Sequence, residues 1–466
     1  WSDTTASVRG LSARSVRSKS KPLSAESRRR SNATRARRAV EDGQYRKAIQ
    51  SLTSMGLALA SSDVFNEMLE KHPSVDPPTI PETPPPNPIV VSVEQLVGAL
   101  RSFPAGSAPG PSGLRANHLK EAVFCPSPNR ANHTLLCLSR VVNLLCAGKL
   151  PHAVIPHLCG ASLLPCLKKG GGLRPIAVGE VLRRLTSKCA ARAVLPDALQ
   201  ILSPLQVGVG LPAGCEAILH SVMNIHESPS IPADHRFTLL VDFSNAFNSV
   251  DRTALFHEVR TRIPTISSWM ECSYGFQPNL LLENQTIPSC CGVQQGDPLG
   301  PLGFALVLHP IVEKIRESVP GLLINVWYLD DGTLCGTQQD LAAALAIIEA
   351  EGPPRGLFLN RGKSFIHAPD NSSITHPILR GIPTSSDGFT LLGSPVGPTS
   401  FCEDIFSKRV SKLVDTLSKL ADLEDSQMET ALLRSCLALP KVAYVLRTCP
   451  PRPHSRGSRV FRPHYA

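Results

Sequence analysis

The chain has 466 residues and a formal net charge of +10, and it is long enough to bury a sizeable core in two or three domains. It holds no run of about 18 uncharged apolar residues, and its first residues lack the apolar core of a secretory signal, so no membrane partner is expected. The 14 cysteines show no C-x-x-C pairs or His-x-x-x-His spacing, which argues against a zinc site and favours free thiols in a reducing compartment.

The positive charge is concentrated at the N-terminus. Residues 1–47 contain 13 Lys and Arg against 4 Asp and Glu, a net charge of +9, which leaves +1 for the rest of the chain. We predict that residues 1–33 form a disordered basic arm. Such an arm binds polyanions by counterion release, and it equally suits a nuclear import signal, so the expected location is the nucleus or the cytoplasm.

The next residues are predicted to be mostly helical. Residues 34–72 read as a short helical N-terminal segment, with Ser62 as a candidate N-cap, and residues 73–90 read as an extended Pro-rich linker. Within the 34–72 segment, helical patterns cover residues 39–52 and 62–71. After the linker, further helical patterns cover residues 93–103, 114–123 and 134–147. Residues 161–178 then read as a β-hairpin with a Gly-rich basic turn.

Residues 237–241 are a compact β-prone run that ends in Asp242. The following residues are expected to open a helix that continues through Leu255 and Val259. An Asp at the C-terminal end of a buried strand is a common place for a catalytic ligand, although a helix N-cap is the simpler interpretation of Asp242 alone.

Asp330 and Asp331 lie between the apolar runs 322–327 and 332–335, a pattern that predicts strand, tight turn and strand. Adjacent carboxylates repel each other and partial burial would raise their pKa values, and a divalent cation relieves both effects. Oxygen ligands without Cys or His suit Mg²⁺. If Asp242 lies beside the turn, three carboxylates can hold two metal ions for phosphoryl transfer; a solvated Asp-Asp turn is the alternative.

Three motifs together indicate a family. Asp242 with Ala246 and Phe247, then residues 294–301, then residues 328–331 resemble, in order and spacing, the reverse transcriptase of non-LTR retrotransposons, and the resemblance covers residues 90 to 450. It implies an α+β right-hand polymerase with an antiparallel palm sheet, helical fingers and a partial helical thumb.

The implied activity is RNA-directed DNA polymerisation, in which a nucleotide is transferred to a primer 3′-hydroxyl with two Mg²⁺ ions, or Mn²⁺ in their place. The implied partners are an RNA template, a DNA primer and dNTPs. No endonuclease or RNase H signature is visible, so nicking of a target would come from another segment or protein. The oligomeric state is left open.

The resemblance also assigns roles to residues. Asp242, Asp330 and Asp331 would bind metal together with the carbonyl of Phe243. The ring of Phe247 would lie under the sugar and exclude a 2′-hydroxyl, unless it is only a core residue of its helix. The other residues expected around the nucleotide are Asn245, Ala246, Gln295 and Gly296.

Basic residues are assigned to the phosphates in the same way. Lys168 and Arg174 in the 161–178 hairpin would contact the triphosphate, and Lys169 is equally well placed. The helix after the hairpin carries Arg183, Arg184 and Lys188, which are expected to face template or triphosphate. Lys363 matches a family Lys near the active site and is a candidate proton donor to pyrophosphate.

The domain plan places fingers and palm at residues 91–396, with residues 389–397 as the hairpin that grips the primer. Residues 397–449 would form the partial thumb from helices at 401–420 and 425–446, and residues 450–466 an irregular tail. The start at Trp1 indicates a fragment, and a frameshift is our hypothesis for the tail.

Three alternatives stay open. A truncated or decayed copy would keep the fold and only bind nucleic acid. An RNA-dependent RNA polymerase shares the palm chemistry, although Phe247 disfavours it because such an enzyme admits a 2′-hydroxyl. A retron or group II intron enzyme is the third, and it should carry a different C-terminal domain.

Overall fold

The computed structural model describes residues 25–54, 56–59, 61–85, 87–168, 171–369 and 372–449. These residues belong to two compact units. Of the described residues, the first unit combines 25–54 with 410–443, and the second combines those between 56 and 409 with 444–449.

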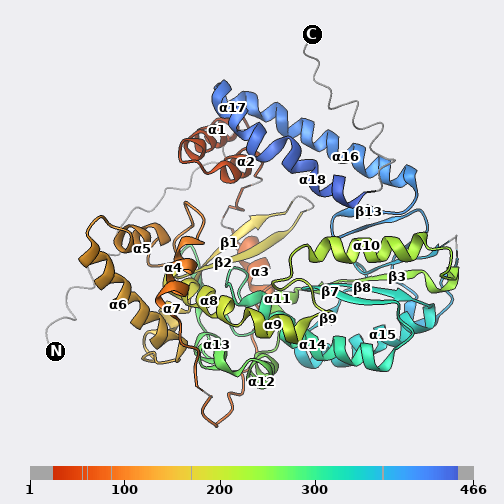
Figure 1. Cartoon of the computed structure of the whole chain (residues 1–466), viewed down its shortest axis with the longest axis horizontal. Coiled ribbons are helices and arrows are strands. Elements are labelled where there is room, and N and C mark those ends of the chain that lie inside the picture. Colours follow the sequence, from red (N-terminus) through yellow and green to blue (C-terminus); the bar gives the residue numbers. More distant parts are fainter. Residues whose placement is uncertain are drawn as a thin grey trace. The chain divides into compact units, whose positions relative to one another are not determined.

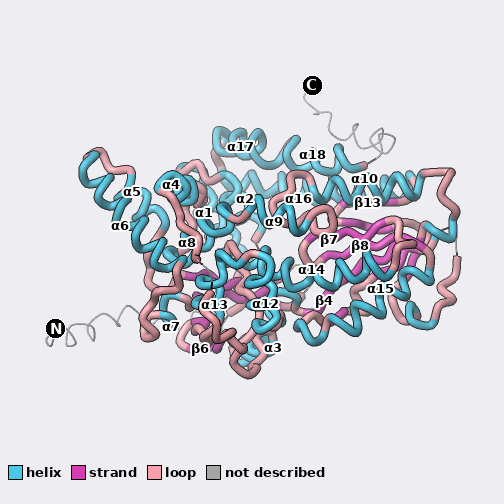
Figure 2. The backbone as a smooth tube through the Cα atoms, turned by 60° about the horizontal axis from the view of Figure 1, so that its bottom comes forward, coloured by secondary structure: helices cyan, strands magenta, loops and turns pink. Residues whose placement is uncertain are grey.

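The centre of the second unit is a five-stranded palm sheet (Figures 1 and 2). Its strand order is β11 (Thr384–Ser385), β10 (Phe365–His367), β3 (Phe237–Val241), β8 (Asp331–Gly336) and β7 (Ile324–Tyr328). All neighbours are antiparallel except the edge pair β10–β11. The predicted antiparallel palm is therefore confirmed, with one parallel edge.

Helices cover both faces of this sheet. The helices α14 (Gly300–Ser318) and α15 (Gln338–Glu351) pack on one face, and α10 (Gly214–Glu227) packs on the other (Figure 1). The central residues of α14 are apolar around the whole helix and almost all are buried. A helix that is apolar all round is stable only inside a core, and α14 supplies much of the main one.

The fingers combine a sheet with helices. The sheet has the order β2 (Leu173–Gly179), β1 (Ala161–Leu167), β5 (Asn279–Leu282) and β6 (Gln285–Pro288), and α3 (Ser62–Glu70) packs against it. The β1–β2 pair is the predicted hairpin. A separate helical core is formed by α4 (Val93–Arg101), α5 (Ala116–Val123), α6 (Pro128–Cys146) and α8 (Val181–Ala193).

The remaining elements of the second unit are short. They are α7 (Ile155–Leu158), α9 (Leu195–Leu202), β4 (Phe243–Ser244), α11 (Ala246–Ser249), α12 (Arg252–Arg262), α13 (Ser267–Tyr274), β9 (Phe358–Leu359), β12 (Phe389–Leu391) and β13 (Ser394–Val396), with 3-10 turns at Ala233–His235, Pro264–Ile266, Pro353–Arg355 and Pro377–Leu379. In the described part of the chain no helix is both long and apolar enough to cross a membrane.

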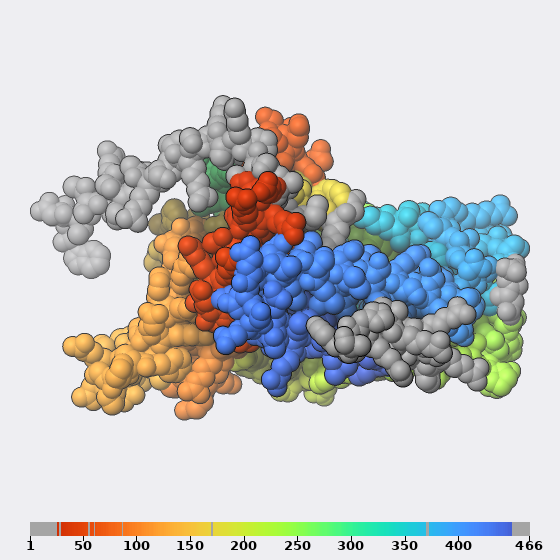
Figure 3. All heavy atoms as spheres, turned by 90° about the horizontal axis from the view of Figure 1, so that it is seen from above, coloured from red at the N-terminus to blue at the C-terminus, as the bar shows by residue number. Residues whose placement is uncertain are grey.

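The first unit joins the N-terminal helices to thumb helices, and Figure 3 shows these red and blue segments side by side. Its elements are α1 (Ala25–Glu41), α2 (Tyr45–Thr53), the end of α16 (Thr399–Ser418), a 3-10 turn (Lys419–Leu423), α17 (Ser426–Leu432), a π-helical turn (Leu433–Leu437) and the start of α18 (Leu439–Thr448). Small residues of α1 such as Ala36 and Ala39 pack with Leu413 and Leu432 in one core.

Three predictions near the two ends need correction. Disorder through residue 33 is wrong for residues 25–33, which lie in α1, because α1 buries an alanine face against the thumb helices. The single helices predicted at 39–52 and 425–446 are each interrupted. Residues 1–24 and the tail 450–466 lie outside the described residues.

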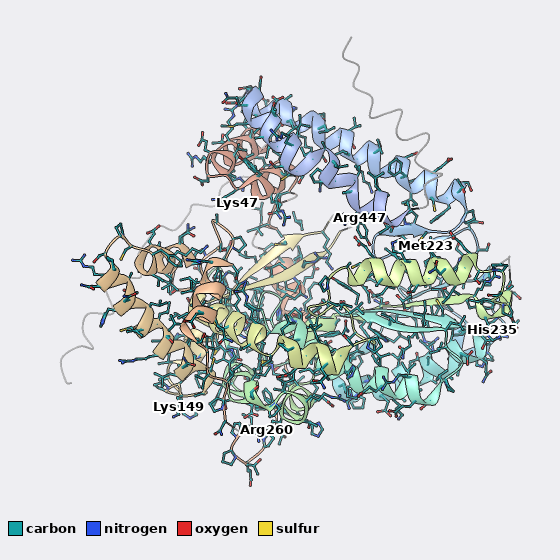
Figure 4. All side chains as sticks on the ribbon, in the orientation of Figure 1. Lys47, Lys149, Met223, His235, Arg260 and Arg447 are labelled. Carbon is teal, nitrogen blue, oxygen red and sulfur yellow. The ribbon has the colours of Figure 1, made fainter. Side chains whose placement is uncertain are left out.

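The Pro-rich segment 73–90 is docked along the palm rather than a free linker. The Thr79 N–H donates to the Thr253 hydroxyl of α12 at 3.1 Å, and the Arg260 guanidinium, labelled in Figure 4, donates to the Thr83 carbonyl at 2.7 Å. Proline restricts the backbone of this segment even before folding, so the segment loses little conformational entropy when it docks. A few hydrogen bonds are therefore enough to hold it in place.

The continuous helix predicted after Asp242 is also wrong. Instead, β4 pairs with β9, Asn245 takes a left-handed φ of +52°, and α11 ends before α12 begins at Arg252. The Asp251 carboxylate caps α12 by accepting the Ala254 N–H at 2.7 Å.

Candidate active site

Strand register places two of the predicted carboxylates opposite each other. In the antiparallel β3–β8 pair, Val241 faces Gly332, so that Asp242 and Asp331 stand one step further along at facing positions. Facing residues of an antiparallel pair have Cβ atoms about 4.5–5.5 Å apart. Both carboxylates also line the same cavity.

Asp330 comes from the predicted hairpin turn. Tyr328 pairs with Asp331 across β7 and β8, so that Leu329 and Asp330 form a two-residue loop. The strand, tight turn and strand expected around Asp330 and Asp331 are therefore present. The turn places Asp330 and Asp331 at the end of the palm sheet where β3 leads into Asp242.

The site raises the pKa of each of these carboxyl groups. Removal from water is the main cause for all three, and the pKa of Asp331 rises to about 6 because Asp330 and Asp242 add like charge. The Asp242 carboxylate also raises the pKa of Asp330, which Arg174 opposes. Lys363 and Lys168 oppose the rise at Asp242. The three carboxylates form one acidic centre with cations around it.

This centre suits a hard divalent cation. The Oδ2 atom of Asp242 is buried and has no hydrogen-bond partner among the described residues, which leaves a costly orphaned acceptor. The donors are carboxylate oxygens, the ligand type that Mg²⁺ prefers. In the described chain, no three or more His, Cys, Asp or Glu side chains already lie in a metal-holding arrangement, so the side chains would have to close around an ion.

The backbone of Asp242 is anchored by a turn that is distant in sequence. The Asp242 N–H donates to the buried hydroxyl of Ser364 at 3.1 Å, and the Asp242 carbonyl accepts the Asn360 N–H at 2.8 Å. Next to it, the Phe243 ring stacks on Trp327 with centroids 5.9 Å apart. The predicted metal contact of the Phe243 carbonyl stays a prediction. The sequence offers no local signal for Ser364.

The predicted phosphate-binding cations surround the acidic centre. Lys168 and Arg174 are exposed at the end of the β1–β2 hairpin, and Lys363 lines the cavity with Asp242. Burial lowers the pKa of Lys168, and the positive charges of Lys71, Lys363 and Arg174 lower it further. Lys169 lies outside the described residues.

Lys71 belongs to this cationic group, and the sequence did not reveal it. Its ammonium lies 3.3 Å from the Glu67 carboxylate, which also accepts the Leu173 N–H of the hairpin at 2.8 Å. The Lys71 carbonyl accepts the Asn245 side-chain amide at 2.9 Å. The C-terminal end of α3 therefore connects the fingers hairpin to the predicted nucleotide site. Lys71 precedes Asp242 by 171 positions, and no local sequence pattern predicts that the two residues belong to one site.

Phe247 and its neighbours occupy α11. The Phe247 ring is half-buried and stacks on Phe304 of α14 with centroids 4.8 Å apart. Ala246 is buried, whereas Asn245 is exposed. One face of the Phe247 ring is thus a core contact, as the alternative interpretation required.

The loop before α14 carries the predicted Gln-Gly pair. The Gln295 carbonyl accepts the Ala177 N–H of β2 at 3.0 Å. Gly296 has φ +137°, and a Cβ there would lie 2.3 Å from the Ala177 carbonyl oxygen, so only Gly fits. Pro298 precedes α14, and Pro301 lies in the first turn of that helix.

The prediction for Arg183 is wrong. Its side chain is fully buried and pairs with Asp297 at 2.9 Å, so it does not face template or triphosphate. A cation can be buried when a carboxylate and other acceptors satisfy it. Arg184 donates to the Ala108 carbonyl at 2.6 Å and Lys188 to the Ser102 hydroxyl at 3.2 Å, so both are held within the fingers.

The cavity beside the carboxylates has a volume of about 510 Å³. It lies between the palm strands and the β12–β13 hairpin, and its lining includes Asp242, Asp331, Lys363 and Leu392. The hairpin at 389–397 is thus present and faces the acidic centre across an open space.

Part of this chain is similar to known proteins. Residues 166–396 match the model of the family described as reverse transcriptase (RNA-dependent DNA polymerase). The retrotransposable element SLACS 132 kDa protein of Trypanosoma brucei gambiense is 26% identical over an alignment of 280 residues, and the match covers 57% of this chain and 22% of that protein. The chain thus spans less than a quarter of the length of this curated relative.

A solved structure is also similar. The structure of apo telomerase from Candida tropicalis truncated from its C-terminal domain matches at 13% identity with a TM-score of 0.37, over 52% of this chain and 54% of that chain. The sequence matches confirm the resemblance to reverse transcriptases of non-LTR retrotransposons, and the family match extends over residues 166–396.

Proposed function

We propose that this chain adds dNTPs to the 3′-hydroxyl of a DNA primer on an RNA template, with Asp242, Asp330 and Asp331 as its catalytic carboxylates. The observation that carries the proposal is the facing pair Asp242 and Asp331 across β3 and β8, with the orphaned Oδ2 atom of Asp242 beside an open cavity. Facing carboxylates with raised pKa values are a costly arrangement that a functional site explains.

The carboxylates and the Phe243 carbonyl would hold two Mg²⁺ ions, or Mn²⁺ ions. When bound, such ions lower the pKa of an attacking hydroxyl and neutralise charge on the transferring phosphoryl group. The residues of the chain supply the positions. The β3–β8 register holds Asp242 opposite Asp331, and the Ser364 hydroxyl fixes the Asp242 backbone.

The triphosphate would lie among the cations. Lys168 and Arg174 come from the fingers hairpin, Lys71 from the end of α3 and Lys363 from the turn before β10. Their mutual repulsion is relieved by a polyanion. Lys363 is also the candidate proton donor to the departing pyrophosphate.

The sugar and base would be held by residues at the start of α11 and by the loop before α14. The Phe247 ring, fixed on Phe304, would exclude a 2′-hydroxyl, while Asn245 and Ala246 would border the nucleotide. Gln295 and Gly296 would lie beside the nascent base pair, where the φ of Gly296 lets the backbone approach closely. The cavity toward the 389–397 hairpin would receive the primer end.

At the level of the whole element, we infer that this chain is the polymerase segment of a non-LTR retrotransposon protein. The match to a retrotransposable element protein supports this. Nicking of the target would come from another segment or protein. The positive charge of residues 1–47 suits nucleic-acid contact or nuclear import.

Primer extension tests the proposal. The parent chain should extend a DNA primer on an RNA template with Mg²⁺ and dNTPs, Asp331→Asn should lose the activity, and the exposed Asp234→Asn should keep it. Unchanged activity in Asp331→Asn would overturn the assignment of the carboxylates. Binding of primer-template without extension by the parent would favour a decayed copy, and preference for rNTPs would favour an RNA polymerase.

A further inference from the structure

The turn that carries the acidic residues adopts a backbone conformation that its sequence disfavours. Leu329 has φ +56°, in the left-handed region that side chains with a Cβ avoid. Two-residue hairpin loops usually meet this need with Gly, Asn or Asp. Since Leu329 directly precedes Asp330, the direction of both acidic side chains depends on how this backbone is held.

One side chain from outside the hairpin holds it. The Oε1 atom of Gln206 accepts the Leu329 N–H at 2.7 Å, and the Nε2 atom of Gln206 donates to the Leu329 carbonyl at 3.1 Å. Gln206 is only 2% exposed. Both backbone groups of the strained residue are therefore bonded to one buried amide.

The backbone around Gln206 is fixed to the same strand. Gln206 forms a parallel bridge with Trp327, in which the Val207 N–H donates to the Trp327 carbonyl at 2.8 Å and the Trp327 N–H donates to the Leu205 carbonyl at 2.7 Å. A Cβ on Gly208 would lie 2.6 Å from the Leu329 nitrogen. The segment after α9 is thus built to lie directly against the turn.

We propose that Gln206 is a positioning residue for the catalytic turn: its amide holds Leu329 in the left-handed conformation and so aims Asp330 and Asp331 at the cavity. The inference rests on the proposed function of these two carboxylates. The role needs a donor and an acceptor on one neutral side chain. A carboxylate would lose the donor and add negative charge beside the acidic centre.

Kinetics give the first test. Gln206→Met keeps the length of the side chain but removes both bonds to Leu329, together with the bond that Oε1 accepts from the Gly208 N–H at 3.0 Å. We expect kcat to fall about 10- to 100-fold, as for lost partners of metal ligands. The KM for dNTP should stay within about twofold, because no substrate contact is removed. Gln338→Met on α15 is the matched control. The Gln338 amide also forms hydrogen bonds with backbone groups, the Ser373 carbonyl and the Thr375 N–H. Parent-like kcat in a folded Gln206→Met would overturn the proposal.

A rescue separates positioning from general loss of structure. Gly adopts positive φ freely, so Leu329→Gly placed in the Gln206→Met background should recover about fivefold or more of the lost kcat. A merely structural role of Gln206 would gain nothing from this second change. No recovery in the folded double variant would contradict the proposed role.

Hydrogen exchange gives a readout that does not depend on activity. In the full-length parent the Leu329 amide should be protected, and Gln206→Met should lose that protection while the Trp327 amide keeps its own. Unchanged protection of Leu329 would overturn the proposal even if the polymerase is active. A parent that shows this pattern but extends no primer would instead contradict the proposed function.

Discussion

Arg183 and Asp297 form an ion pair inside the fold, with 2.9 Å between Nη2 and Oδ2 and side-chain exposures of 0% and 2%. Arg183 also donates to the Gln294 side chain at 2.6 Å, and the Tyr274 hydroxyl donates to Asp297 at 2.9 Å. The pair therefore ties α8 of the fingers to the loop that carries Gln295.

Loss of this ion pair should lower the stability of the fold. Arg183→Met leaves the Asp297 carboxylate buried without its cation, and we expect the free energy of unfolding to fall by about 3–5 kcal/mol. Urea denaturation followed by circular dichroism measures it. Arg192→Met, at an exposed position of the same helix, is the matched control and should change stability by less than about 0.5 kcal/mol. Equal effects of the two substitutions would contradict the importance of the pair.

Lys71 should contribute to dNTP binding. In Lys71→Ala we expect the KM for dNTP to rise about threefold or more with kcat nearly unchanged, because a cation on the triphosphate acts equally in ground and transition state. Steady-state primer extension measures both constants. The exposed Lys149→Ala, labelled in Figure 4, is the control for general loss of positive charge. The same KM in parent and Lys71→Ala would place Lys71 outside the nucleotide site.

Phe247 should decide the choice of sugar. A smaller side chain in Phe247→Val would leave room for a 2′-hydroxyl, and we expect discrimination against rNTPs to fall by about tenfold or more. Competition between dNTP and rNTP during extension measures the ratio. Because Phe247 also stacks on Phe304, a melting experiment must show that the variant is folded. A folded variant with unchanged discrimination would leave Phe247 as a core residue.

His226 should make the palm sensitive to acid. Burial, together with the charges of His367 and Arg236, lowers the pKa of His226 to about 4. Its other neighbours are the Thr238 hydroxyl, at 2.8 Å, and the ring of Phe389.

In the unfolded chain His226 binds a proton near its ordinary pKa of about 6.5. The contribution of neutral His226 to the free energy of unfolding is therefore fully present above that pH and is lost as the pH drops from 6.5 toward 4. The loss from this one group is about 3 kcal/mol at most. Urea denaturation at several pH values measures it. His226→Gln should weaken the dependence, and an identical pH profile in both proteins would show that another group is responsible.

Much of the site followed from local patterns. The hairpins at β1–β2 and β7–β8 and the strand before Asp242 were predicted because alternating or compact apolar runs with turn residues between them specify such elements. The family match and the palm topology confirm the polymerase fold that the motif order predicted. The roles of individual site residues remain predictions for the experiments above.

The errors arose where distant parts of the chain decide the outcome. The N-terminal residues of α1 looked disordered because their charge is visible in the sequence, while the thumb helices that cover their alanine face are more than 370 residues away. Arg183 looked like a surface cation because nothing near it in sequence announces Asp297.

By itself, the sequence determined the two hairpins and the strand before Asp242, because such elements depend on the spacing of apolar and turn residues along a short segment. Only the tertiary structure decided which side chains face Asp242 and the Leu329 turn. Ser364, Lys71 and Gln206 reach the site through hydrogen bonds between segments about 100 or more residues apart, and no local periodicity encodes such contacts.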